Sequence, residues 1–459
     1  MKNGQISFWQ SRPGVMPTVS PELDSNLEVD VAIVGGGLTG LWTAWALKSR
    51  EPDLEVAVLE AEEVGFGASG RNGGWLSGKP VGLRHVLAKL PTGRSGVLAA
   101  DQVLERSIHE IVEILGADQI GAAGGGWMQV ATTASQMGRI EDYLKKSRSW
   151  GVSPEDLRLM SAAEVTDRVA ISGALGALYS PDCYRVDPVL MINALAKLVT
   201  DSGVTIFEHS RVGEIRRGHV RVGNHTVRAQ HQIVVATEAY SFWEPGQRRR
   251  LLPLNSSMIV TDPLDDDQWA HIGWRGAECV SGTAHTYFYA QRTVDGRIAI
   301  GGRGKPYRFA SQVDDRGRVD ELRDVHALED VLNGLFPGLS AKAAHAWCGV
   351  LGVSRDWSPF IDQDLSTGVT HVGGYAGQGL TAAYVAGQAT ADLILHRNTE
   401  LTALPWVRSM PRRWEPEPLR WIGATALYRA YRLADRLEDK SGSPRTSWVA
   451  QVADRVAGR

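Results

Sequence analysis

Asp30-Val-Ala-Ile-Val34 runs directly into Gly35-Gly-Gly-Leu-Thr-Gly40, which has the form G-x-G-x-x-G. The first five residues form a short apolar run, the pattern of a buried parallel strand. Leu41 to Ser49 is dense in alanine, leucine and tryptophan and predicts a helix, and Glu55 to Leu59 predicts a second strand. Together these segments predict a strand–helix–strand unit of about thirty residues.

The glycines of this unit have the positions that a bound dinucleotide requires. Gly35 permits a tight turn, Gly37 lets the backbone approach a pyrophosphate, and Gly40 lets the helix pack closely on the strand. The pyrophosphate would lie at the helix N-terminus, where free N–H groups and the helix dipole favour an anion. Glu60 ends the second strand and is placed to accept hydrogen bonds from a ribose hydroxyl. A glycine turn without a ligand is the alternative, but the strand, helix and second strand favour a nucleotide site. The predicted contacts here are Gly35, Gly36, Gly37, Leu38, Thr39, Gly40 and Glu60.

A second glycine-rich segment, Gly65-Phe-Gly-Ala-Ser-Gly-Arg-Asn-Gly-Gly-Trp75, follows closely. It resembles the flavin-contacting loop of the D-amino-acid oxidase (DAO) family of FAD-dependent oxidoreductases, and most of all that of its γ-glutamylputrescine-oxidase-like, amine-oxidising members. Bare glycine backbone lets a flat ring come close, and an arginine can neutralise phosphate. A flexible loop without a ligand is the alternative. The resemblance implies that five residues of this loop contact FAD, namely Ser69, Arg71, Asn72, Gly73 and Gly74.

A third cluster, Gly373-Gly-Tyr-Ala-Gly-Gln-Gly379, joins a predicted strand over Val369 to Gly374 to a predicted helix over Leu380 to His396. It resembles the family's C-terminal flavin motif, in which a helix N-terminus points at the flavin ring. A second dinucleotide site is rejected, because no second strand follows this helix. The resemblance implies further FAD contacts in this cluster and in the middle of the chain, at Val212, Ala236, Gly349, Gly377, Gly379, Leu380 and Thr381.

The sequence departs from the family at three positions. Some members attach flavin through a cysteine seven residues before an aspartate, but Gly349 stands seven residues before Asp356 and Cys348 is one residue off. We therefore expect FAD to bind non-covalently. Leu351 stands where amino-acid-oxidising members often carry a carboxylate-binding arginine, which favours an amine substrate. Ala299 stands where some members carry an oxygen-activating lysine, so dioxygen and an electron carrier both stay open as the acceptor.

The substrate-pocket candidates lie around a predicted hairpin with its turn at Asp295-Gly296. Aromatic rings beside a flavin can hold an ammonium group by cation–π contact. Ordinary packing on a sheet face, with solvated arginines, is the alternative for each of them. The candidates are Tyr287, Tyr289, Arg292 and Arg303, and no metal site is predicted from the spacing of histidine, cysteine and acidic residues.

The resemblance implies an α/β fold of the glutathione-reductase-2/DAO type. A Rossmann-like FAD-binding domain would be assembled from residues 28–95, 180–248 and 340–400, with an inserted antiparallel-sheet substrate domain from residues 96–179 and 249–339. Residues 405–459 form a C-terminal helical extension. Its apolar residues at helical spacing are expected to pack on the protein or on a partner chain, with a membrane surface as the less favoured alternative; they are Leu419, Ile422, Ala426, Ala430, Leu433 and Leu437.

Composition narrows the class of protein. The 459 residues contain 49 Lys plus Arg and 52 Asp plus Glu, a net charge of −3, which argues against a nucleic-acid partner. The three cysteines fit a reducing compartment rather than a disulfide framework, and no targeting or membrane-spanning segment is expected, so a cytoplasmic location is predicted. The oligomeric state is not predicted.

The expected activity is oxidation of a C–N bond in an amine or an N-substituted amino acid. Hydride passes to the flavin, the imine is hydrolysed, and the electrons pass to dioxygen. Two alternatives stay open: a dehydrogenase of the same fold that passes electrons to a quinone or a protein carrier, and a non-catalytic FAD-binding assembly protein.

Overall fold

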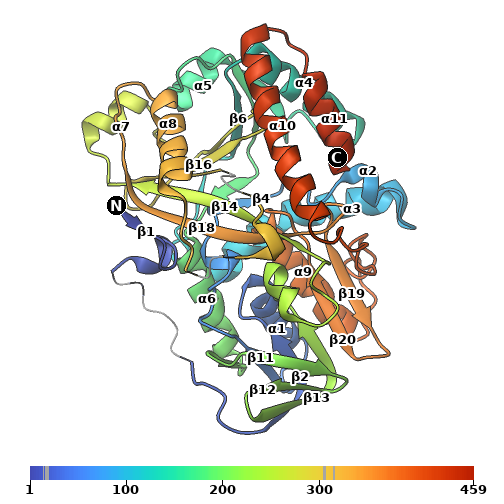
Figure 1. Cartoon of the computed structure of the whole chain (residues 1–459). Coiled ribbons are helices and arrows are strands. Elements are labelled where there is room, and N and C mark those ends of the chain that lie inside the picture. Colours follow the sequence, from blue (N-terminus) through green and yellow to red (C-terminus); the bar gives the residue numbers. More distant parts are fainter. Residues whose placement is uncertain (14, 16–19, 303–305, 314–315, 459) are drawn as a thin grey trace.

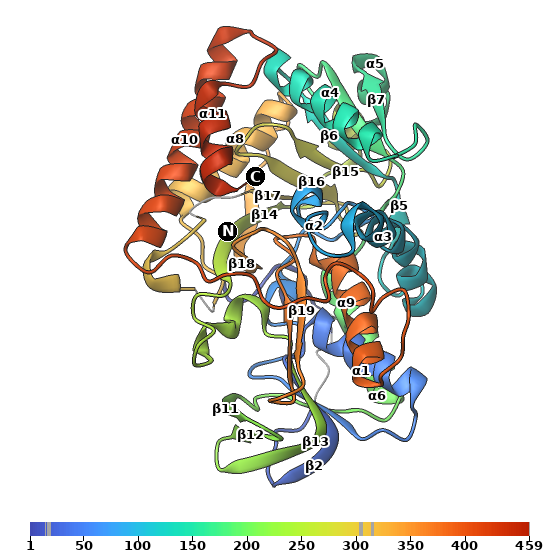
Figure 2. The same ribbon diagram turned by 90° about the vertical axis from the view of Figure 1, so that its right-hand side faces the viewer.

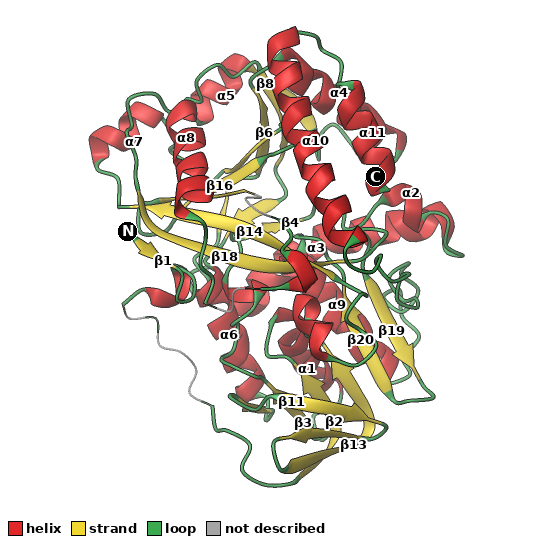
Figure 3. Cartoon of the chain, in the orientation of Figure 1, coloured by secondary structure: helices red, strands yellow, loops and turns green. Residues whose placement is uncertain are grey.

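The computed structural model describes residues 1–13, 15, 20–302, 306–313 and 316–458. Two large β-sheets and a small one carry helices on their outer faces (Figures 1 and 3). The eight-stranded sheet lies in the lower part of Figure 1, and the nine-stranded sheet lies above it.

The eight-stranded sheet is built around the glycine-rich unit. Its strands β2, β3, β10 and β13 run parallel, and β20 extends the parallel set beyond β13. The strands of this sheet are β2 Leu27–Val34, β3 Val56–Leu59, β10 Thr205–Phe207, β11 Val212–Arg216, β12 His219–Val222, β13 His225–Val235, β19 Phe360–Asp364 and β20 Val369–Gly373.

Helices α1 (Leu38–Arg50), α6 (Pro188–Asp201) and α9 (Gly379–Ile394) share one core with the apolar face of this sheet. Helices α1 and α9 pack very closely. A Cβ added to Gly387 would lie 2.8 Å from Cβ of Trp42, so only glycine allows this approach. The consequence is that the helices following the first and third glycine clusters lie side by side, although about 340 residues separate them in the chain.

The nine-stranded sheet is mainly antiparallel, with parallel pairs β1–β18 and β15–β6. The predicted turn at Asp295-Gly296 joins β16 to β17, with Gly296 at φ +73°. Its strands are β1 Lys2–Asn3, β6 Trp127–Ala131, β7 Arg158–Ser161, β8 Gly176–Ser180, β14 Leu252–Thr261, β15 Cys279–Gly282, β16 Phe288–Arg292, β17 Ile298–Gly302 and β18 Ala343–Val353.

The small sheet connects the two large ones. It consists of β4 (Trp75–Ser77), β9 (Cys183–Arg185) and β5 (Ala123–Gly124). Strand β4 lies in the glycine-rich stretch over 65–82, in which no regular structure is expected from the sequence. That expectation is wrong for Trp75–Ser77, because the partner strand β9 lies about a hundred residues away and no local pattern reveals it.

Eight further helices of the described chain cover the sheets: α2 Arg84–Leu87, α3 Gly93–Leu115, α4 Ala134–Ser149, α5 Ala162–Arg168, α7 Asp266–Ile272, α8 His326–Leu335 and the C-terminal pair α10 Leu419–Ser441 and α11 Trp448–Ala457. The C-terminal pair packs against the upper part of the molecule beside α4 (Figures 1 and 2). Within the described part of the chain, no helix is both long enough and apolar enough to cross a membrane.

The buried face of α10 differs from the predicted one. It consists of Arg420, Tyr431, Ala434 and Glu438, whereas Leu419, Ile422, Leu433 and Leu437 are exposed by 41 to 61 %. The stripe was expected to pack on its own chain or on a partner chain; the first expectation is wrong for these four residues, and the second stays a prediction. Polar contacts of Asp435 and Glu438, described below, join this helix to the rest of the protein.

Candidate active site

One cavity of about 480 Å³ is lined by residues from all three sheets. The three glycine clusters, far apart in the sequence, meet on its wall. The predicted residues that line it are Gly35, Gly37, Leu38, Thr39, Glu60, Ser69, Arg71, Asn72, Gly73, Val212, Ala236, Gly349, Gly377, Gly379 and Leu380, together with Tyr287 and Tyr289.

The N-terminus of α1 faces this cavity, and its N-cap residue carries no side chain. Gly37 is the N-cap residue, and a Cβ added to it would lie 3.0 Å from Oγ of Ser69. That same Oγ accepts the Leu38 N–H at 3.0 Å. Gly35, at φ +110°, turns the chain so closely that a Cβ would lie 2.9 Å from the Ala236 carbonyl oxygen. The bare backbone at a positive helix end fits a pyrophosphate.

Glu60 marks one end of the cavity. Its Oε2 accepts the Gly36 N–H at 2.7 Å, and its Oε1 accepts the Glu62 N–H at 3.0 Å. Burial raises the pKa of Glu60, although the backbone donors act in the opposite direction. Val212 and Ala236 line the cavity near this end. The carboxylate is thus oriented by backbone and is available to a ribose hydroxyl.

Arg71 is almost completely buried in the wall. Its guanidinium lies 4.5 Å from the ring centroid of Phe66 and donates to the Cys348 carbonyl at 3.5 Å, and its own carbonyl accepts the indole N–H of Trp347 at 3.0 Å. These contacts fix a positive charge within the predicted flavin loop.

Cys348 and Gly349 lie on opposite faces of β18, because side chains alternate along a strand. A Cβ on Gly349 would lie 3.4 Å from Cβ of Arg71, on the cavity side. The Cys348 thiol lies on the other side, 3.6 Å from Oδ1 of Asn255. Burial raises its pKa to about 12, which keeps it a protonated thiol.

The third glycine cluster meets the first through two hydroxyl groups. Oγ1 of Thr39 and the Tyr375 hydroxyl lie 3.0 Å apart. Gly377, at φ +103°, turns the chain into α9. In the described structure, the side chain of Gln378, the N-cap residue of α9, makes no capping hydrogen bond. A second helix N-terminus therefore borders the cavity with free N–H groups.

Glu238 also lines the cavity, and the sequence analysis assigned it no role. Its carboxylate accepts three backbone N–H groups, from Gly352 at 2.7 Å, Gly374 at 2.8 Å and Tyr375 at 3.2 Å. Burial raises its pKa to about 7 despite these three donors. A Cβ on Gly352 would lie 2.0 Å from Oε2, so glycine is required there. Glu238 ties the ends of β13, β18 and β20 together.

The far end of the cavity is aromatic. The Tyr289 hydroxyl lies 2.9 Å from Oγ of Ser256, and a Cβ on Gly73 would meet the Tyr289 ring at 2.7 Å. The Tyr289 ring makes an edge contact with Trp75, with centroids 6.5 Å apart. Here too the structure adds residues that the sequence analysis missed, namely Trp75, Lys79, Gln129, Ser256 and Ser281.

Some predicted residues lie behind the wall instead of on it. Three of them are glycines that pack closely against neighbouring atoms of the protein, namely Gly36, Gly40 and Gly74. The fourth is Thr381, whose hydroxyl donates to the Ser77 carbonyl at 2.8 Å. Arg292 was predicted to lie in the substrate pocket, and this prediction is wrong. Its guanidinium donates to the Trp274 carbonyl at 2.9 Å and lies 4.1 Å from the Trp269 ring centroid, away from the cavity. Arg303 lies outside the described residues.

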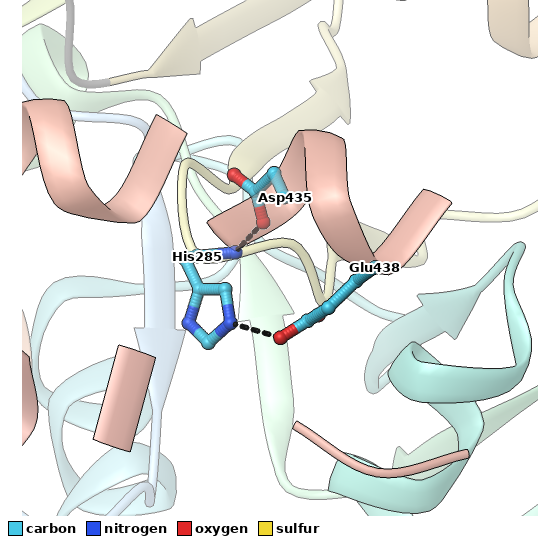
Figure 4. A group of neighbouring side chains, drawn as sticks. All are labelled: His285, Asp435 and Glu438. Carbon is cyan, nitrogen blue, oxygen red and sulfur yellow. Dashed lines mark hydrogen bonds and ion pairs between the residues drawn. The ribbon is translucent and has the colours of Figure 1, made fainter. Parts of the chain in front are cut away.

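Helix α10 holds the loop that carries Tyr287 through hydrogen bonds. Figure 4 shows Asp435 and Glu438 of α10 beside His285. Asp435 accepts the His285 and Thr286 N–H groups at 2.8 and 3.0 Å, and Glu438 lies 3.0 Å from Nε2 of His285. Arg139 of α4 also pairs with Glu438. These groups could ligate a metal by type and spacing. Their hydrogen bonds and the ion pair with Arg139 instead explain the cluster as a clamp, that is, a set of contacts that holds α10 against the loop at residues 285–287.

The comparisons with known proteins agree with this site. The model of the DAO family, described as FAD dependent oxidoreductase, matches residues 30–393. Gamma-glutamylputrescine oxidoreductase of Escherichia coli (strain K12) is 28 % identical over 384 residues, which cover 81 % of this chain and 85 % of that protein. Glycine oxidase of Geobacillus kaustophilus (strain HTA426) is 24 % identical over 387 residues, 82 % of this chain and 96 % of that protein.

The crystal structure of glycine oxidase from Geobacillus kaustophilus superimposes with a TM-score of 0.70 at 21 % identity, covering 85 % of this chain and all of that chain. The two proteins therefore share a fold. The uncapped helix ends, the glycine turns and the buried arginine fit the phosphates and the flat ring of FAD. Because the family model covers well over half of the sequence, the chain belongs to the DAO family and is an FAD-dependent oxidoreductase.

Proposed function

We propose that the protein oxidises a C–N bond in a small amine or an N-substituted amino acid and passes the electrons to dioxygen. The observation that carries this proposal is the continuity of the cavity. One lining surface combines Glu60, the glycine backbone at Gly73 and the rings of Trp75, Tyr287 and Tyr289, which form its aromatic end. A substrate at the aromatic end would lie directly beside the flavin loop.

When bound, FAD supplies an acceptor for the two electrons and the hydrogen of a hydride. The chain's residues position the substrate. Tyr289 is oriented by its hydroxyl contact with Ser256, and the rings of Trp75 and Tyr287 line the place where the neutral amine would lie. The apolar rings also exclude water from the reacting carbon.

The described residues that line this end include no histidine, aspartate or glutamate. The proposed reaction needs none, provided that the amine reacts in its neutral form. The substrate carbon then gives up a hydride and its nitrogen gives up a proton, which leaves an imine. Water converts the imine to a carbonyl compound and a free amine or ammonia, and dioxygen takes up two electrons and two protons to become hydrogen peroxide.

The named activities of the relatives support an amine or amino-acid substrate. One relative is a gamma-glutamylputrescine oxidoreductase and another a glycine oxidase, and each aligns over more than four fifths of this chain.

The proposal is tested by mixing the FAD-loaded protein anaerobically with panels of polyamines, N-methyl amino acids and aminophosphonates. We expect at least one compound to bleach the flavin absorbance near 450 nm, and air to restore it with one peroxide per turnover. If hydroxy acids bleach the flavin and no amine does, C–N oxidation is refuted.

A dehydrogenase that passes electrons to a carrier or a membrane quinone is the second candidate. The exposed apolar residues of α10, Leu419, Ile422, Leu433 and Leu437, favour it, because they form an unpaired apolar stripe on the described surface. Turnover with a soluble quinone, slow reoxidation by air and sedimentation with anionic vesicles would favour this candidate over the oxidase.

A further inference from the structure

Lys79 lies just beyond β4 and lines the aromatic end of the cavity. Its ammonium nitrogen is 3.8 Å from the ring centroid of Trp127 and 5.2 Å from that of Trp75. Within the part of the chain that the structure describes, no carboxylate forms an ion pair with it. Two aromatic faces thus hold a cation at the substrate end of the cavity, without an acidic partner.

The titratable groups that face Lys79 cannot neutralise it. They are the thiols of Cys183 and Cys279. The Cys183 thiol donates to the Tyr184 carbonyl at 3.7 Å, and burial raises the pKa of Cys279 well above its usual value, so the Cys279 thiol keeps its proton. Burial also lowers the pKa of Lys79 to about 8, which leaves it mostly charged at neutral pH.

The other charged side chains on the cavity wall have partners elsewhere. Arg211 pairs with Glu62 near the Glu60 end, Glu238 accepts three backbone N–H groups, and Arg71 is stacked on Phe66. Lys79 is therefore the charged group, among the described lining residues, that a ligand at the aromatic end would meet.

We propose that Lys79 binds an anionic group of the substrate, so that the substrate is an amine that also carries a carboxylate or a phosphonate. The inference rests on the proposed C–N oxidation and narrows its substrate class. An oxyanion beside Lys79 would gain a charge-assisted hydrogen bond in a partly desolvated place. Gln129 and Ser281, which line the same end from neighbouring strands, offer further polar contacts. The amine of the same molecule would then lie toward Gly73 and Tyr289.

The first test measures binding and needs no turnover. Holoenzyme is titrated with propionate, methylphosphonate and the neutral analogue propionamide, and binding is followed by the visible absorbance of the bound FAD. We expect both anions to bind more tightly than propionamide, and Lys79→Met to weaken anion binding about tenfold to a hundredfold. Lys79→Arg keeps the cation and should retain most of the affinity.

The matched control is Lys89→Met, which removes the same charge from an exposed position ten residues away. All variants are compared at equal FAD content, so a folding defect is recognised before binding is measured. Anion affinity should fall as the pH rises above about 8, because the protonated ammonium is the binding form. Equal binding of propionate and propionamide, or an unchanged anion affinity in Lys79→Met, would overturn the inference.

The second test separates this inference from the proposed function. If wild-type protein oxidises amines, each carboxylate-bearing amine is compared with its primary amide. Lys79→Met should raise KM for the acid and leave the constants for the amide nearly unchanged. A loss of kcat for both, with KM unchanged, would make Lys79 a group of the chemical step and refute the anchor. If no amine bleaches the flavin, the proposed function fails, while the propionate titration still decides the role of Lys79.

Discussion

Gly40→Ala is the perturbation whose outcome the structure determines most directly. An added Cβ would lie 2.0 Å from the Gly35 carbonyl oxygen and 3.2 Å from Cγ2 of Ile33. Real Cβ atoms essentially never come within 3.0 Å of such a neighbour, so the start of α1 must move by about 1 Å (3.0 − 2.0). The obstacle is backbone, which cannot rotate aside as a side chain can.

The expected cost follows from two opposing effects. Overpacking of this kind costs about 1–3 kcal/mol, and replacing glycine by alanine in a helix returns up to about 1 kcal/mol. We expect a net loss of about 1–2 kcal/mol in the free energy of unfolding. The same shift moves the N–H groups at the start of α1 away from the predicted pyrophosphate position, so FAD affinity should fall at least tenfold, since about 1.4 kcal/mol corresponds to a factor of ten.

The assay pairs urea denaturation of the apoprotein, followed by tryptophan fluorescence, with FAD titration followed by quenching of the flavin fluorescence. The matched control is Gly423→Ala in α10, where an added Cβ would meet no atom within 4 Å. This control should be neutral or slightly stabilising and should bind FAD normally. Wild-type stability and FAD affinity in Gly40→Ala would refute the close-packing argument, as would an equal loss in both variants.

Three further predictions follow from buried groups. Acid precipitation of the holoenzyme should release the FAD into the supernatant, because the Cys348 thiol lies on the opposite face of β18 from Gly349; flavin that stays in the pellet would contradict this. Lys79→Met should stabilise the apoprotein by up to about 3 kcal/mol below pH 8, since the pKa falls from 10.5 to about 8 on folding and each unit corresponds to about 1.4 kcal/mol. The destabilisation of the wild-type apoprotein by the charged Lys79 is largest below pH 8 and disappears as the pH rises toward 10.5. Urea midpoints are measured for wild type and variant across this pH range. A difference between them that does not change with pH would contradict the prediction. Glu438→Gln should speed hydrogen exchange at residues 285–287. Burial alone would raise the pKa of Glu438, but the Ser447 N–H, Arg139 and His285 hold it at about 2, so this contribution to stability is present above about pH 4.5 and is lost only as the pH falls toward 2. Unchanged exchange there, with Asp439→Asn as the exposed control, would refute the clamp.

Glycine spacing and short-range periodicity determine the nucleotide-binding unit from the sequence. The run Asp30 to Val34, the turn to Gly40 and the strand that ends before Glu60 are consecutive, so each element constrains the next. The other two glycine clusters were assigned to FAD through their resemblance to the flavin motifs of the DAO family. The predicted subdivision of the chain into domains remains a prediction.

The roles of individual side chains in the substrate end were decided only by the tertiary structure. Lys79 follows a strand whose partner, β9, lies about a hundred residues later, and its aromatic neighbour Trp127 belongs to another sheet. Arg292 shares its hairpin with Tyr289 but turns to the Trp274 carbonyl. Glu238 gains its significance from N–H groups of Gly352 and Gly374, more than a hundred residues away. The spacing of apolar residues indicates which face of a helix or strand is buried. It does not indicate which distant backbone group or aromatic ring packs against that face. The sequence therefore determined how the chain is built to take FAD, whereas long-range packing decided what surrounds the substrate and how α10 lies against the loop of Tyr287.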